Sequence, residues 1–161
     1  MILGLSTDTF TLLHVVISLI GILAGAVVLA EMIAGRRLAA WNAIFLVTTV
    51  VTSVTGFFFH ADSFGPPQVI GGISLAALAV ALFALYGRSL AGFWRATYVA
   101  SAMLALYLNV FVAIVQAFQK LPFLEALAPT QSEPPFLVAQ SIVLVAFVIL
   151  GFLAVRRFRP A

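Results

Sequence analysis

Polar side chains are rare inside the long apolar stretches of this 161-residue chain, and they are the residues that could do chemistry. A polar group in hydrocarbon is costly, so each one needs a partner or a ligand. Four of them lie at similar depth near the ends of four different stretches: His14, Thr55, Gln116 and Gln140. We expect these four, with Asn109 closer to the bilayer midplane, to be the ligand-binding residues.

His14 has a predicted direction as well as a depth. His14, Ser18, Gly21 and Gly25 follow a 4-3-4 spacing, which places them on one face of a helix. Gly21 and Gly25 form a GxxxG pattern, which allows a second helix to approach closely. The imidazole is therefore expected to point into the bundle or at a partner helix. There it could form an interhelical hydrogen bond to Thr55, Gln116 or Gln140, or it could contact a ligand or a metal.

The two histidines raise the question of a cofactor. His14 and His60 could be the axial ligands of a b-type haem, although His60 is expected at the membrane edge, whereas facing haem ligands lie at matched depth. His14, His60 and Asp62 are weak candidates for a divalent metal site, because they lack a ligand spacing. The sequence leaves the cofactor open, with haem b as one alternative.

Asn109 is expected near the bilayer midplane, where its carboxamide must find a partner. Thr49 and Thr52 are predicted at the same level, and such interhelical hydrogen bonds contribute about 0.6–2 kcal/mol each. This favours a structural clamp over a substrate contact.

The apolar stretches contain no Ser–His, Asp–Asp or His-Glu-x-x-His arrangement, so we predict that the protein is not an enzyme.

The elements that position these residues follow from composition. The chain is 64% hydrophobic and only 8% charged, so its solvent must be lipid. About 20 apolar residues cross the hydrocarbon core. We predict an all-α transmembrane bundle forming one domain, residues 1–161, with spans at about 10–33, 39–59, 67–86, 94–118 and 135–155. The polar, Pro-rich segment 119–134 is predicted to be an outer loop that closes over the polar cluster.

The distribution of basic residues predicts the orientation. Seven of the eight lie on one side of the predicted spans: Arg36, Arg37, Arg88, Arg95, Arg156, Arg157 and Arg159. Short cytoplasmic loops collect Lys and Arg, so we expect the N-terminus outside and the C-terminus in the cytoplasm. Because these groups belong to the inner turns, no basic stripe is left for nucleic acid. Cysteine is absent, which excludes thiol–disulfide chemistry and Cys-ligated metals.

Four segments carry a resemblance to a known family: residues 13–21 (LHVVISLIG), 52–58 (TSVTGFF), 107–111 (YLNVF) and 129–136 (PTQSEPPF). They resemble an uncharacterised family of small integral membrane proteins of proteobacteria. The resemblance covers nearly the whole length. It implies a location in the bacterial inner membrane and carries over no function.

Three functional classes fit the sequence. The first is a non-enzymatic bundle that binds or transports a small apolar or amphiphilic ligand in an outward-facing polar pocket. The second is an accessory subunit of a larger membrane complex, or a homo-oligomer. The third is a b-type haem electron-transfer protein. The small size and sparse polar groups favour the first two, and we take ligand binding as the leading expectation.

Overall fold

The computed structural model describes residues 1–59 and 65–159, which are almost entirely helical. The helices are α1 (Thr7–Ile33), α2 (Ala39–Thr55), α3 (Pro66–Leu82), α4 (Trp94–Lys120), α5 (Pro122–Glu125) and α6 (Pro134–Arg157). A 3-10 turn (η1, Gly56–Phe58) extends α2, and a π-helical turn (η2, Phe83–Gly87) extends α3. Five helices are long and apolar enough to span a membrane, which confirms the predicted five-helix, all-α architecture.

Local signals explain where the helices begin and end. The Ser6 hydroxyl accepts a hydrogen bond from the Thr9 N–H at 3.2 Å and caps α1. Pro66 and Pro134 occupy the first turns of α3 and α6, where a missing N–H costs little. Gly35 follows α1 with a φ of +77°, a left-handed conformation that glycine adopts without strain.

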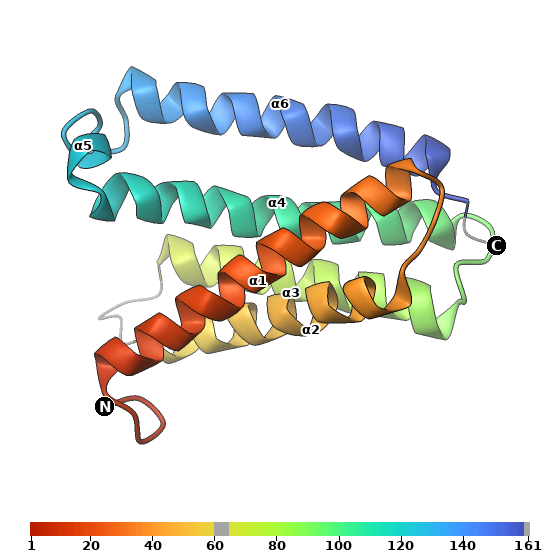
Figure 1. Ribbon diagram of the computed structural model, residues 1–161, viewed down its shortest axis with the longest axis horizontal. Helices are drawn as coiled ribbons and strands as arrows, with labels where there is room; N and C mark the ends of the chain where they lie inside the picture. The colour runs from red at the N-terminus through yellow and green to blue at the C-terminus, as the bar shows by residue number, and fades with distance from the viewer. Residues whose placement is uncertain (60–64, 160–161) are drawn as a thin grey trace.

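The long helices alternate in direction, and α1 crosses the others diagonally (Figure 1). The ends of α1, α3 and α6 therefore lie with the beginnings of α2 and α4 at one end of the bundle. We call this the arginine end, because it holds Arg36, Arg37, Arg88, Arg95, Arg156, Arg157 and Arg159. The N-terminus, α5 and Lys120 lie at the opposite end, which we call the amino-terminal end.

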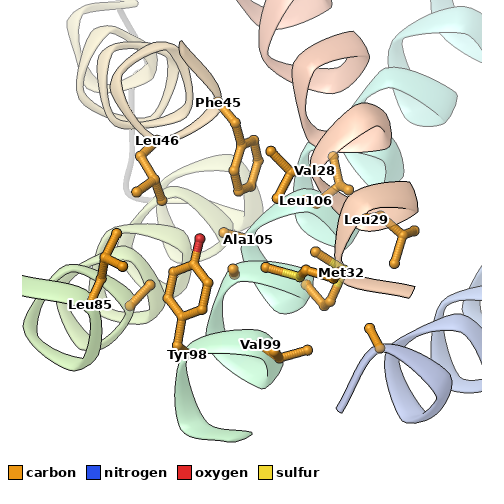
Figure 2. Close-up of a cluster of buried hydrophobic side chains, with 14 of the residues drawn as sticks. Val28, Leu29, Met32, Phe45, Leu46, Leu85, Tyr98, Val99, Ala105 and Leu106 are labelled. Carbon is orange, nitrogen blue, oxygen red and sulfur yellow. The ribbon is translucent and has the colours of Figure 1, made fainter. Parts of the chain in front are cut away.

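The main hydrophobic core occupies the half of the bundle towards the arginine end. It combines side chains of α1, α2, α3 and α4, among them Met32, Phe45, Leu85 and Tyr98 (Figure 2). Phe158, just after α6, is fully buried in the same core. At this end α1 and α6 come together, whereas towards the amino-terminal end they diverge (Figure 1).

Gly21 and Gly25 are buried where α1 packs against α2 and α4. A Cβ atom on Gly25 would overlap the Leu106 Cδ1 atom and lie 3.0 Å from the Phe45 ring. A Cβ atom on Gly21 would lie 3.1 Å from the Thr48 hydroxyl. Gly25 is therefore too close to its neighbours for a side chain unless Leu106 shifts, whereas a side chain at Gly21 would require Thr48 to move by a few tenths of an ångström.

α6 packs through one narrow seam and exposes the rest of its surface. The seam has the 4-3-4 spacing of a coiled-coil contact: Phe136, Gln140, Val143, Phe147, Leu150 and Ala154. Only 6% of the most apolar segment of α6 is buried, compared with 28–39% for the other four long helices. Lipid or a partner must cover the remaining face, since it is apolar.

The segment between α4 and α6 is shorter and more structured than the predicted loop 119–134, because α4 continues to Lys120. Ala128 is fully buried against Phe118 and Phe136, whose rings lie 5.4 Å apart. Glu133 accepts three hydrogen bonds, two from Thr130 and one from the Ser132 N–H. Desolvation raises the pKa of Glu133, but these hydrogen bonds outweigh it and leave the pKa below its ordinary value.

Candidate functional site

His14 is half-buried on α1 and faces α2. Its Nδ1 atom lies 2.8 Å from the Thr55 Oγ1 atom. The Thr55 hydroxyl also donates to the Val51 carbonyl at 2.7 Å. A hydroxyl has one hydrogen to donate, so Thr55 must accept from His14. The neutral ring therefore carries its proton on Nδ1, and Nε2 keeps a lone pair.

The imidazole is held among aromatic rings. The Phe59 ring meets it edge to face at 5.1 Å, and Phe10 packs against Phe59 at 5.2 Å. Gly56 lies beside the ring, since a Cβ atom there would be in ordinary van der Waals contact with His14 Cε1 at 3.9 Å. Within residues 1–59 and 65–159, no hydrogen bond reaches Nε2. The result is a hydrogen-bond acceptor set in an apolar surround.

Of the residues predicted to bind a metal or a haem, only His14 is described. His60 and Asp62 lie outside the described residues. Among the residues that are described, no group of three His, Asp or Glu side chains is close enough to hold a metal ion. The second axial haem ligand that the sequence suggested, His60, is thus not among the described residues.

A second contact continues the α1–α2 interface below His14. The Ser18 hydroxyl donates to the His14 carbonyl at 2.7 Å and lies 3.3 Å from the Thr52 hydroxyl. The face that His14 and Ser18 share with Gly21 and Gly25 thus lies against α2, and Gly25 also meets α4. This face joins helices within one protomer.

Gln116 and Gln140 form hydrogen bonds away from His14. Gln116 is exposed and donates to Gln119 on its own helix at 3.3 Å. Gln140 is buried in the α4–α6 seam, where Nε2 donates to the Phe111 carbonyl at 3.2 Å. Its Oε1 atom is buried without a hydrogen-bond partner in the described part of the chain.

The four predicted cluster residues therefore divide among different contacts. His14 pairs with Thr55, and no hydrogen bond between described residues links either glutamine to that pair. The reason is geometric. Because α1 crosses the bundle diagonally, its first half diverges from α6 at the depth where the sequence placed all four side chains (Figure 1).

Asn109 donates to the Thr49 hydroxyl at 3.5 Å and joins α4 to α2. Thr49 was one of its two expected partners. At this distance the bond is long, and it fits a structural clamp between the helices.

Two further polar contacts were missed by the sequence analysis. Ser53 and Ser74 hydroxyls lie 2.9 Å apart between α2 and α3, and the Tyr98 hydroxyl donates to Asn42 Oδ1 between α4 and α2. Helix α2 is thus joined by polar side chains to α1, α3 and α4. The recurrence of Asn, Ser and Thr along residues 42–55 is the signal that could have revealed this role.

Two hollows stand out in the described structure, and neither is lined by the predicted site residues. One, at the arginine end, has a volume of about 10 Å³. It is lined by Glu31, Arg36, Arg37, Trp41, Asn42 and Phe158, together with the apolar side chains of Val28, Met32 and Leu38. It has room for one water molecule. The other is a shallow apolar groove of about 440 Å³ on the exposed face of α6, lined by Ser141, Ile142, Val145, Ala146 and Ile149.

No family model, curated protein or solved structure matches this chain. The resemblance to proteobacterial membrane proteins stays a prediction.

Proposed function

We propose that this protein is a non-enzymatic component of the bacterial inner membrane that binds or transports a small amphiphilic molecule, with His14 as the polar contact. We place the N-terminus outside and the C-terminus in the cytoplasm. The partition of charge supports this orientation. Seven arginines gather at the arginine end, whereas the amino-terminal end holds Lys120 and the acids Asp8, Glu125 and Glu133.

The hydrogen bond between His14 and Thr55 carries the proposal. Because Thr55 gives its hydrogen to Val51, the imidazole presents Nε2 as an acceptor. An acceptor beside the Phe59 ring suits a molecule with a hydroxyl or ammonium group on an apolar body. The apolar body would lie along the exposed α1 surface near Leu13. The binding place is thus an edge of the α1–α2 pair that is open to lipid, rather than an enclosed pocket.

Nitrogen-15 NMR of histidine-labelled protein in detergent micelles tests this proposal. The chain has two histidines, so a His60→Gln variant isolates the His14 signals. We expect the Nδ1–H tautomer in this variant and a mixture of tautomers when Thr55→Val is added. Octylphenol, which has a hydroxyl donor, should shift the Nε2 resonance, and octylbenzene, which has none, should not. An Nε2–H tautomer, or equal responses to the two probes, would contradict the proposal.

The exposed face of α6 favours one alternative, an accessory subunit of a larger membrane complex. With 6% of its most apolar segment buried, α6 has the largest surface left for a partner helix. Mass measurement of the protein released from its native membrane in mild detergent tests this alternative. A stable species heavier than one chain plus its detergent would favour it over a monomeric binding protein.

Electron transfer through a b-type haem is a second alternative, because an imidazole with a lone pair on Nε2 can bind the haem iron as an axial ligand. A reduced-minus-oxidised visible spectrum of the purified protein tests it directly. The α and Soret bands of a b-type haem, lost in His14→Ala, would replace the amphiphile proposal with electron transfer.

A further inference from the structure

The fold brings two of the three arginine-bearing segments into contact. Gly35, in the turn after α1, lies against the end of α6, so that a Cβ atom on it would be 3.3 Å from the Arg157 carbonyl oxygen. Phe158 anchors this contact, because it is fully buried with its ring 5.9 Å from Tyr98. We call the resulting surface the arginine junction, and it consists of Arg36, Arg37, Arg157 and Arg159.

The arginine junction has an excess of positive charge. Arg36 is compensated, since its Nε and Nη2 atoms lie 3.0 and 3.1 Å from the two carboxylate oxygens of Glu31. Glu31 is the only acid at this end among the described residues. Arg37, Arg157 and Arg159 are exposed and have no acidic partner within the described chain. Like charges held close together repel, so an anion bound here would relieve the repulsion.

The surroundings indicate what kind of anion fits. The hollow beside Arg36 and Arg37 holds one water at most, so it cannot enclose a nucleotide or another free anion of that size. The junction instead lies at the ends of spanning helices, beside the half-exposed indole of Trp41. Tryptophan favours the level of the lipid headgroups. The exposed Phe152 ring, with the Arg156 guanidinium 5.0 Å from its centre, continues the surface towards hydrocarbon.

We propose that the arginine junction binds the phosphate groups of an anionic phospholipid in the adjoining leaflet. Guanidinium groups form strong, often bidentate hydrogen bonds to phosphate, and basic surfaces between helix ends recognise such headgroups. A bound lipid would bridge the turn after α1 and the end of α6. It would therefore stabilise the attachment of α6, the long helix with the least buried surface. This site is separate from His14 and does not depend on its role.

Native mass spectrometry of the purified full chain, titrated with defined lipids, tests the proposal. We expect cardiolipin, which carries two phosphates, to bind more tightly than phosphatidylglycerol, and phosphatidylcholine to bind weakly. Each of Arg37→Gln and Arg157→Gln should weaken cardiolipin about five-fold, and the double variant about thirty-fold, which is about 2 kcal/mol at 1.4 kcal/mol per tenfold. Circular dichroism checks that each variant is folded.

Arg88→Gln is the matched control, because it removes one arginine from the same end of the bundle. The Arg88 guanidinium lies over the Trp94 ring at 5.5 Å, outside the junction. Its effect on cardiolipin should stay below two-fold. If Arg88→Gln and Arg37→Gln weakened cardiolipin binding equally, the effect would come from net charge alone and the proposed site would be wrong. Equal binding of phosphatidylcholine would also overturn it, and stabilisation by inorganic pyrophosphate alone would assign the junction to a free phosphate instead of a lipid.

Discussion

Replacing Gly25 by alanine tests the close approach of α1 to α2 and α4. The added methyl group would overlap Leu106 Cδ1 and lie 3.0 Å from the Phe45 ring. Leu106 is 1% exposed and Phe45 is fully buried, so neither side chain has solvent to move into. We therefore expect Gly25→Ala to destabilise the protein even though alanine favours a helix more than glycine does.

Two opposing free energies set the size of this effect. Alanine in place of glycine within a helix contributes about 0.5–1 kcal/mol of stability. Overpacking a close-packed interior costs about 1–3 kcal/mol. The midpoints of these two ranges give a net loss of about 1 kcal/mol for Gly25→Ala. For a chain of this size, that lowers the melting temperature by about 2–4 °C.

Gly72→Ala provides the matched control, because nothing lies within 4 Å of its added Cβ atom. This variant should melt at or slightly above the wild-type temperature, by up to about 1 kcal/mol of added stability. Thermal unfolding in one detergent, followed by circular dichroism, compares the three proteins. If Gly25→Ala melts no lower than Gly72→Ala, α1 does not approach α4 as closely as described.

Three further predictions concern polar side chains. Tyr98→Phe leaves the buried Asn42 Oδ1 without its donor and should cost about 1–3 kcal/mol in thermal unfolding, with partial recovery when Asn42→Leu is added. Gln140→Leu removes a buried oxygen that has no hydrogen-bond partner among the described residues, together with the Nε2 hydrogen bond to the Phe111 carbonyl, and should raise stability by about 1 kcal/mol. A loss of stability would mean that the oxygen does have a partner. Because the folded pKa of Glu133 is lowered, its stabilisation is present above the ordinary carboxyl pKa and is lost as the pH falls through the folded value. The difference in melting temperature between wild type and Glu133→Gln should therefore shrink on acidification, and a constant difference would contradict this.

The helices could be predicted from sequence because their signals are local. Apolar length placed the five spans within a few residues of the observed ones, and the sequence also marks their ends with Pro66, Pro134 and Gly35. The predicted span 94–118 corresponds to Trp94–Lys120, for example. The pairing of Asn109 with Thr49 also followed from depth, because α2 and α4 are in contact at that level.

The partners of the glutamines could not be predicted, because depth alone does not determine which helices meet. Gln140 and His14 lie at similar distances from the starts of α6 and α1, yet the diagonal path of α1 separates its first half from α6. The crossing arises where Gly25 allows Phe45 and Leu106 to approach α1, a contact between residues far apart in sequence. Periodicity within one helix carries no information about such a contact.

The burial of Phe158 has a consequence for how the protein is assembled. Its ring packs in the same core as Met32 and Tyr98. Phe158 belongs to the segment after α6, whereas most of the core residues come from helices earlier in the chain. During synthesis α1 to α4 enter the membrane first, so a hole beside Tyr98 stays open until α6 has crossed the bilayer. Insertion of α6 and closure of the core are thus coupled, and a chain in which α6 fails to insert would expose an incompletely packed core.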